Sequence, residues 1–120
     1  MQPSFAWVDI PVVNLERAIR FYRAVLNSDI ECIETPTLRF GLLAHTDDNI
    51  GGCLVEGTDN QPSLTGALIY LNVNGRIAAA TEQALQLGGE ILQATHAIGE
   101  HGFRAIIVDS EGNRIALHSR

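Results

Sequence analysis

The sequence contains no lysine, because all eight basic side chains are arginine, against 14 acidic ones. This absence excludes a Schiff-base lysine, a lysine general base and the lysine of a phosphate-binding loop. The net charge of −6 also argues against a nonspecific nucleic-acid binder, which needs clustered cations to displace counterions from phosphates. We therefore expect no nucleic-acid partner, although an acidic surface suits a cationic ligand.

Cysteine and long apolar runs are scarce as well. Cys32 and Cys53 are too far apart for a Cys-x-x-Cys pair, so the sequence carries neither a zinc knuckle nor a thioredoxin-type motif. It shows no signal-like leading segment and no apolar run near the ~20 residues that a membrane span needs. We expect a cytoplasmic protein with reduced thiols and no membrane partner.

The sequence does contain a weak internal repeat, and periodicity of this kind points to architecture. The alternating residues Ala6, Val8, Ile10 and Val12 recur 61 positions later as Ala67, Ile69, Leu71 and Val73. Each half has roughly 55 residues, too few to bury a good core alone. We expect one domain over 1–120, with a first module at about 5–57 and a second at about 66–119.

In each half, the pattern of apolar residues and turn signals predicts a strand, a helix and three more strands. Asn14 suits a helix N-cap, Asn27 and Ser28 end the first helix, and Gly88 with Gly89 ends the second. The expected strands are 5–13, 30–35, 38–44, 51–56, 67–74, 90–94, 103–109 and 114–119, and the expected helices are 15–26 and 76–87. The fold class is α+β, with two tandem βαβββ modules that form curved mixed sheets.

Strand alternation predicts which side chains face the helices and which face a free sheet surface. The residues expected to pack on the helices are Val8, Ile10, Ile69, Leu71, Ile115 and Leu117. The residues expected on the opposite face are Trp7, Asp9, Leu68, Tyr70, Ala116 and His118. A ligand site is expected among the second set.

Three segments carry a resemblance to a known family: 7–22 (WVDIPVVNLERAIRFY), 98–103 (IGEHGF) and 108–119 (VDSEGNRIALHS). Through them the chain resembles the vicinal oxygen chelate superfamily, which includes glyoxalase I, bleomycin and fosfomycin resistance proteins and extradiol dioxygenases. The closing segment is most similar to a glyoxalase-like subgroup. The resemblance implies a homodimer, because relatives commonly complete their ligand cups across subunits.

Enzymes of this family hold a divalent metal with side chains from the first and last strand of each module. The resemblance places those positions at Trp7, Leu54, Leu68 and Ala116, with Cys53 one residue away from Leu54. None of the four side chains is a metal donor. The resemblance therefore implies no metal and no cofactor, and an apolar pocket floor in which Trp7 offers a stacking surface.

Four polar side chains lie two residues beyond those positions: Asp9, Glu56, Tyr70 and His118. They leave open a displaced metal site at Asp9, Glu56 and His118, or an acid–base pair of His118 with either carboxylate. A polar, hydrogen-bonded mouth is the simpler interpretation. His101, between Gly99 and Gly102, adds a loop histidine near the pocket.

Two arginines and a cysteine are further candidates for the site. Arg39 and Arg104 lie within strands, where a guanidinium can hold an anion, but ion pairs at the surface are the more common use. Cys53 is expected to be a buried, unreactive thiol.

The expected function is metal-independent binding or sequestering of a small molecule in an apolar cup. The ligand-binding residues are predicted to be Trp7, Asp9, Leu54, Glu56, Leu68, Tyr70, His101, Ala116 and His118. The alternative is a glyoxalase-like lyase or isomerase, either metal-free or with a displaced metal. A third possibility is that the protein serves for partner interactions as a dimer.

Overall fold

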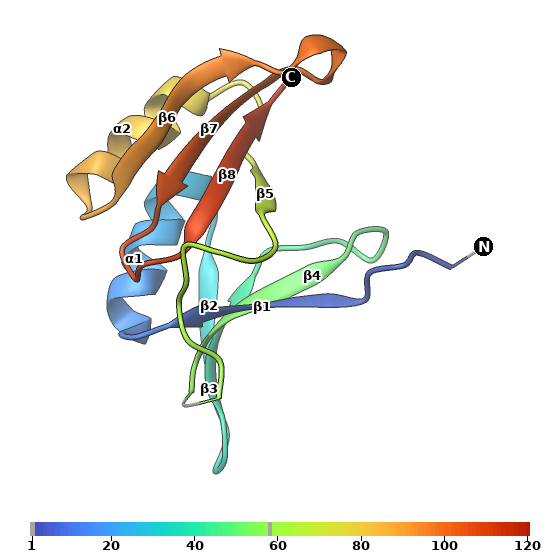
Figure 1. Ribbon diagram of the computed structural model, residues 1–120. Coiled ribbons are helices and arrows are strands. Elements are labelled where there is room, and N and C mark those ends of the chain that lie inside the picture. The colour runs from blue at the N-terminus through green and yellow to red at the C-terminus, as the bar shows by residue number, and fades with distance from the viewer. Residues whose placement is uncertain (1, 58) are drawn as a thin grey trace.

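The computed structural model describes residues 2–57 and 59–120, and it contains the predicted repeat of strand, helix and three strands (Figure 1). Its elements are β1 (Trp7–Val12), α1 (Leu15–Leu26), β2 (Ile30–Glu34), β3 (Arg39–Leu43), β4 (Gly51–Glu56), β5 (Ile69–Asn72), α2 (Ile77–Gln86), β6 (Glu90–Ala97), the 3-10 helix η1 (Gly99–His101), β7 (Phe103–Val108) and β8 (Arg114–Ser119). No helix in the described part is long and apolar enough to span a membrane.

Each module forms its own four-stranded mixed sheet, which confirms the α+β class. The strand order is β1-β4-β3-β2 in the first sheet and β5-β8-β7-β6 in the second. In each sheet the first strand of the module pairs in parallel with the last, and the other pairs are antiparallel. The first strand of a module is therefore an edge strand of its sheet.

Three strands differ from the expected ranges by three or more residues. β1 begins at Trp7 rather than Phe5, because its partner strand β4 begins at Gly51, opposite Trp7. β5 is likewise shorter than expected. β6 continues to Ala97, since β7 still pairs with it there, opposite Phe103.

The ends of the two helices follow the expected local chemistry. The side chain of Asn14 accepts a hydrogen bond from the amide of Arg17 at 3.0 Å, which is the N-cap arrangement. Asn27 ends α1 in the left-handed conformation with φ of 49°. Gly88 follows α2 with φ of 96°, where a side chain would be strained.

One hydrophobic cluster joins the modules. The helices α1 and α2 contact each other, and α1 also packs on the first sheet. Its buried residues are Leu15, Ala18, Ile19, Phe21, Tyr22 and Val25. The six strand residues expected to face the helices all belong to this cluster or pack against it: Val8, Ile10, Ile69, Leu71, Ile115 and Leu117. That prediction of faces is confirmed.

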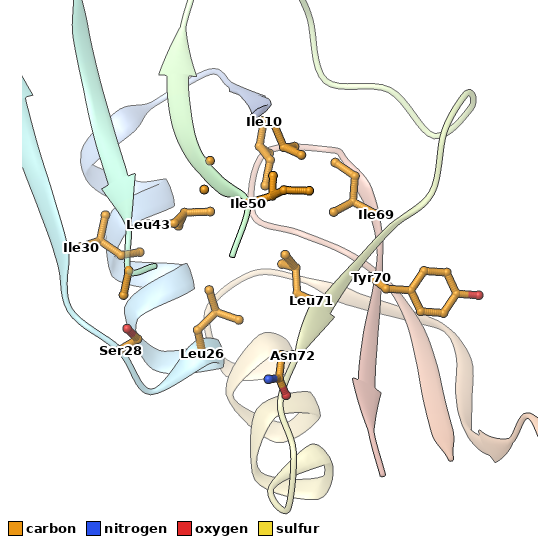
Figure 2. A pocket seen from close by; sticks show the side chains of 14 residues that line it. Ile10, Leu26, Ser28, Ile30, Leu43, Ile50, Ile69, Tyr70, Leu71 and Asn72 are labelled. Carbon is orange, nitrogen blue, oxygen red and sulfur yellow. The ribbon is translucent and has the colours of Figure 1, made fainter. Parts of the chain in front are cut away.

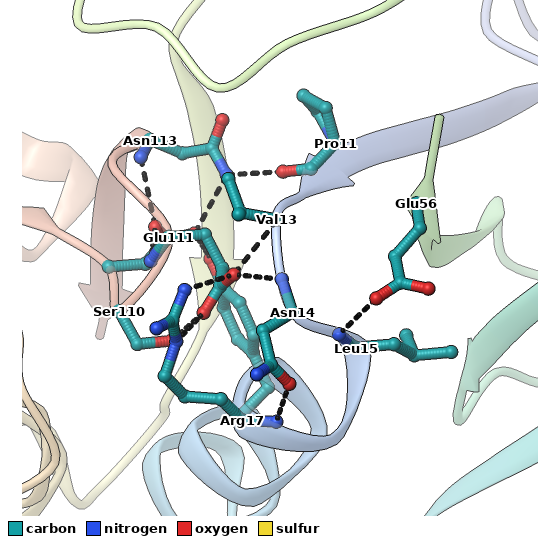
Figure 3. Close-up of polar contacts among 11 residues, drawn as sticks. Pro11, Val13, Asn14, Leu15, Arg17, Glu56, Ser110, Glu111 and Asn113 are labelled. Atoms are coloured by element: carbon teal, nitrogen blue, oxygen red, sulfur yellow. Dashed lines mark hydrogen bonds and ion pairs between the residues drawn. The ribbon is translucent and has the colours of Figure 1, made fainter. Parts of the chain in front are cut away.

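The turn between β7 and β8 reaches across to the start of α1 (Figure 3). The side chain of Glu111, which is inaccessible to solvent, accepts hydrogen bonds from the amides of Val13 at 2.9 Å and Asn14 at 2.7 Å. It also accepts from Arg17 Nε at 2.7 Å and from the hydroxyl of Ser110 at 2.8 Å. The second module thus supplies partners for the free N–H groups of a helix in the first.

A second carboxylate in the same turn adds further hydrogen bonds to this contact. Asp109 accepts hydrogen bonds from the Tyr22 hydroxyl at 2.5 Å and from the amides of Glu111 and Asn113. The amide nitrogen of the Asn113 side chain then donates to the Pro11 carbonyl at 2.7 Å. Burial, and then the nearby Asp109, raise the pKa of Tyr22 well above its ordinary value, so the phenol stays a donor. We call residues 109–113 the clasp.

Replacing Glu111 with Gln is expected to lower the free energy of unfolding by roughly 2–3 kcal/mol at pH 7, since hydrogen bonds to charged groups contribute about 1.5–3 kcal/mol. Burial alone would raise the pKa of Glu111, but hydrogen bonds from Arg17, Asn14, Ser110 and Val13 outweigh it and lower the pKa below the ordinary value. Its contribution is therefore complete above the unfolded pKa of about 4.3. It is lost as the pH falls through the lowered, folded pKa.

Urea unfolding followed by circular dichroism between pH 3 and 8 measures both effects. The difference between wild type and Glu111→Gln should shrink below about pH 4. Glu90→Gln, at the exposed start of β6, is the matched control and should change stability by less than about 0.5 kcal/mol. Equal destabilisation by the two variants would show that the clasp does not hold the modules together.

Candidate functional site

Strand register decides which side chains share the open face of each sheet, by which we mean the face turned away from the helices. In the first sheet, Trp7 pairs with Gly51 and Asp9 pairs with Cys53. Residues that are paired in register point to the same side of a sheet. Trp7, Asp9 and Cys53 therefore lie together on this open face.

Two predicted ligand-binding residues lie on the opposite face. Leu54 pairs with Ile10, and both are buried in the hydrophobic cluster. Glu56 accepts a hydrogen bond from the amide of Leu15 at 2.9 Å, so it stabilises the start of α1, and it also pairs with Arg39 at 3.2 Å. The structure thus removes Leu54 and Glu56 from the open face and puts Cys53 there.

The length of the repeat explains this difference. The first strands recur at an offset of 61, but β8 begins 63 residues after β4 (114 against 51). The counterpart of Ala116 in the first module is therefore Cys53. A slip of one residue moves every side chain of a strand to the other face, which is why Leu54 was misplaced.

Hydrogen bonds fix the side chains of the first open face. Trp7 Nε1 donates to Asp9 Oδ1 at 3.0 Å, and the Cys53 thiol donates to the same oxygen at 3.3 Å. The indole stacks edge-on against His45, with ring centroids 6.2 Å apart. A Cβ at Gly51 would lie 2.9 Å from the indole, so the glycine leaves room for it. Trp7 is 45% exposed and presents an aromatic surface to solvent.

The second open face brings together Tyr70, Ala116 and His118, as predicted from alternation. Tyr70 pairs with Ala116 in register, and its ring lies 6.2 Å from the ring of His118. His118 Nε2 donates to the carbonyl of His101 at 2.6 Å, which ties η1 to β8. Leu68 lies just before β5 and is partly buried. His118 makes no hydrogen bond with Asp9 or Glu56 among the described residues, so neither expected acid–base pair forms within one chain.

Arg104 and His96, which were not predicted to be ligand-binding residues, share this open face with Tyr70. Arg104 pairs in register with both His118 and His96. Its Nε donates to His96 Nε2 at 3.1 Å, and its Nη1 donates to the Tyr70 hydroxyl at 2.5 Å. The register of β6 shifts twice between Ile91 and His96, so simple alternation could not place His96 on this face.

A shallow hollow adjoins this cluster at the end of the second sheet. Its lining consists of Glu100, His101, Gly102, His118 and Arg120. Gly102 has φ of 94°, and a Cβ there would lie 2.3 Å from the carbonyl oxygen of Ser119. The backbone of this loop therefore lies directly on β8, and His101 takes part in the site through its carbonyl.

Another hollow, of about 460 Å³, lies on the other side of the sheets, between β1, β5 and the end of α1 (Figure 2). Its lining is mainly aliphatic: Val8, Ile10, Leu26, Ile30, Leu43, Ile50, Ile69 and Leu71. Figure 2 shows the Tyr70 side chain pointing away from it, toward the open face. This hollow was not predicted, because it depends on how the two modules meet.

Solved structures share this architecture over the whole chain. A glyoxalase-related enzyme from Fulvimarina pelagi matches 99% of this chain and 89% of its own, with 16% identity and a TM-score of 0.72. The fosfomycin resistance protein FosX from Listeria monocytogenes matches 100% of this chain and 93% of its own, with 21% identity and a TM-score of 0.68. This chain has the vicinal oxygen chelate fold.

Glyoxalase I from Zea mays has the same fold at a TM-score of 0.71 and 20% identity, and this chain spans 46% of its length. The sequence matches no protein-family model and no curated protein. The comparisons therefore agree with the resemblance carried by the opening and closing segments, at the level of the fold.

The residues that the family resemblance places at metal positions do not fit a divalent cation. Trp7, Leu68 and Ala116 offer no donor atom, and the corrected fourth position holds Cys53. Burial, and then the hydrogen bond to Asp9, raise the pKa of the Cys53 thiol to about 11, so it is protonated at neutral pH. Within residues 2–57 and 59–120, no three His, Cys, Asp or Glu side chains are grouped to hold a metal. The displaced site also loses Glu56, which faces the helices.

The raised pKa of Cys53 predicts slow alkylation. A rise from 9.0 to about 11 lowers the thiolate fraction at pH 8 about 100-fold. In a Cys32→Ser variant, iodoacetamide should therefore label Cys53 at least 100-fold more slowly than free cysteine, as measured by mass spectrometry. Cys32, which is exposed, should react readily in a Cys53→Ser variant. Comparable labelling of both would mean that Cys53 is neither buried nor bonded to Asp9.

Proposed function

We propose that this protein binds a small molecule without a metal, on the open faces of its two sheets, in the manner of a glyoxalase-like or bleomycin-resistance-type binding protein. The observation that carries the proposal is the set of side chains on those faces. They offer an indole, a phenol, an imidazole and a guanidinium beside the small residues Gly51 and Ala116. Such a surface provides aromatic contact and directed hydrogen bonds.

Exposed aromatic side chains support this location. Trp7 is 45% exposed and Tyr70 is 46% exposed, although both lie in strands of well-packed sheets. Both are held in place, Trp7 by Asp9 and Tyr70 by Arg104. Fixed, exposed aromatic groups are typical of binding surfaces, because they contribute contact area with little loss of side-chain entropy.

The ligand cup is completed by a second copy of the chain. Within one chain, no hydrogen bond joins the first-sheet cluster (Trp7, Asp9, Cys53) to the second-sheet cluster (Tyr70, His96, Arg104, His118) among the described residues. The edge strands β1 and β5 are separated by the aliphatic hollow. A homodimer that places the first sheet of one chain beside the second sheet of its partner would bring both clusters around one ligand.

A glyoxalase-like lyase or isomerase is the second candidate. The observation that favours it is the neighbouring phenol and imidazole of Tyr70 and His118, which are suited to moving protons without a metal. Turnover of dicarbonyl–thiol adducts that His118→Ala abolishes would favour this enzyme over a binding protein.

Ligand binding should be visible through Trp7, the only tryptophan. In a screen of naphthalene- and indole-class compounds, we expect a saturable change in Trp7 emission that is unchanged after dialysis against a chelator. Asp9→Asn should weaken binding about 5- to 10-fold, since one hydrogen bond contributes about 1 kcal/mol. Asp29→Asn, far out on the surface with its side chain 91% exposed, is the control. Binding that disappears with the chelator, or zinc, nickel, manganese or iron at one equivalent per chain, would refute metal independence.

Mixing two inactive variants tests the shared cup. Trp7→Leu and Tyr70→Ala damage different sheets, so each should bind weakly alone. If a cup combines sheets from two chains, a mixed dimer regains one intact cup, and calorimetry of the mixture should show up to one site per mixed dimer. If each cup lies within one chain, mixing restores nothing. Light scattering on the same samples gives the oligomeric state.

A further inference from the structure

Arg104 is a cation held in place by uncharged partners. Its Nε and Nη1 donate to the His96 ring and to the Tyr70 hydroxyl. Three of the seven other arginines form ion pairs with carboxylates, namely Arg17, Arg23 and Arg39. Arg104 forms none with any residue in 2–57 and 59–120.

The hydrogen bonds of His96 establish that it is a neutral acceptor. Its Nδ1 lies 2.8 Å from the carbonyl oxygen of Ala94, which can only accept, so Nδ1 carries the proton. Nε2 then has a lone pair and accepts from Arg104 at 3.1 Å. His96 therefore orients the guanidinium without neutralising it.

The free donors of this cluster lie close together. A guanidinium has five N–H groups, and only two of those of Arg104 are used, which leaves Nη2 without a partner among the described residues. The Tyr70 oxygen accepts from Arg104, so its own hydrogen remains free to donate. Both donors belong to the open face of the second sheet.

The strands of this face carry little negative charge around Arg104. Glu90 is the carboxylate that the register of the described strands places on the open face, and it pairs with Val108, at the other end of β7 from Arg104. Glu100 lines the adjoining hollow beside His101 and His118, but it forms no ion pair with Arg104 among the described residues.

We propose that Arg104 and the Tyr70 hydroxyl bind an oxyanion, the carboxylate or phosphate-type group of the ligand. This inference rests on the proposed use of the open faces for ligand binding, and it names the charge class of the ligand. A planar, pre-oriented guanidinium matches two oxygens of one anionic group, and little side-chain entropy is lost because His96 and Tyr70 already hold it.

The direct test uses acetate and inorganic phosphate as probes, followed by NMR of the His96 imidazole and the Tyr70 ring at constant ionic strength set with chloride. Saturable shifts are expected in the wild type. Arg104→Gln should weaken them at least 10-fold, and Arg104→Lys should retain part of the affinity. Arg20→Gln removes the same charge from the exposed side of α1 and should change nothing. Urea unfolding of each variant verifies that it remains folded.

Tyr70→Phe keeps the ring and Arg104, and should weaken anion binding by a smaller factor than Arg104→Gln. Saturation by acetate alone identifies a carboxylate site, saturation by phosphate alone a phosphate site, and saturation by both a general oxyanion site. The absence of saturable shifts with either probe, or equal affinity in wild type and Arg104→Gln, would overturn the inference.

A matched pair of aromatic probes separates this inference from the proposed function. Benzoate and benzamide differ in charge but hardly in shape. Tighter binding of benzoate than benzamide that Arg104→Gln abolishes would support the oxyanion site. Equal binding of both, seen through Trp7, would leave the small-molecule function intact and remove the oxyanion site.

Discussion

Two buried carboxylates in the turn before the last strand hold the halves of this protein together. Asp109 and Glu111 take hydrogen bonds from the end of β1, from the first turn of α1 and from Tyr22. Burying two carboxylates is unfavourable unless each oxygen has donors, and here each has at least two. Because the clasp fixes where α1 begins, it also fixes how both sheets sit on the shared cluster.

The orientation of the sheets then determines where a ligand can bind. The helices bury one face of each sheet. The open faces carry side chains that are not part of the hydrophobic core. On the first sheet these are Trp7, Asp9 and Cys53, and on the second they are Tyr70 and Arg104 with their histidine neighbours. The first cluster is aromatic and hydrogen-bonded, and the second is cationic. A ligand with an aromatic part and an oxyanion would use both, which differs from the cationic ligand that the acidic composition alone suggests.

Most residues of the open faces and the ends of α1 could be predicted from the sequence. Alternation in β1, β5 and β8 was enough to place Trp7, Asp9, Tyr70, Ala116 and His118, and the caps at Asn14 and Asn27 defined α1. Leu54 and Glu56 were misplaced because β4 was aligned with β8 one residue out of step. His96 and Arg104 could not be joined in advance, because their pairing follows two register shifts in β6. Alternation within a regular strand predicts which face a side chain occupies. Pairing across a strand with register shifts can be known only from the assembled sheet.

The position of the clasp late in the sequence affects when the first module can reach its native packing. Glu111 bonds to residues 98 and 97 positions earlier in the chain, Val13 and Asn14. The first helix therefore leaves the ribosome long before the carboxylates that complete its first turn have been made. Contacts of such long sequence separation are slow to form, so native docking of the first half has to wait until residues 109–113 have been made.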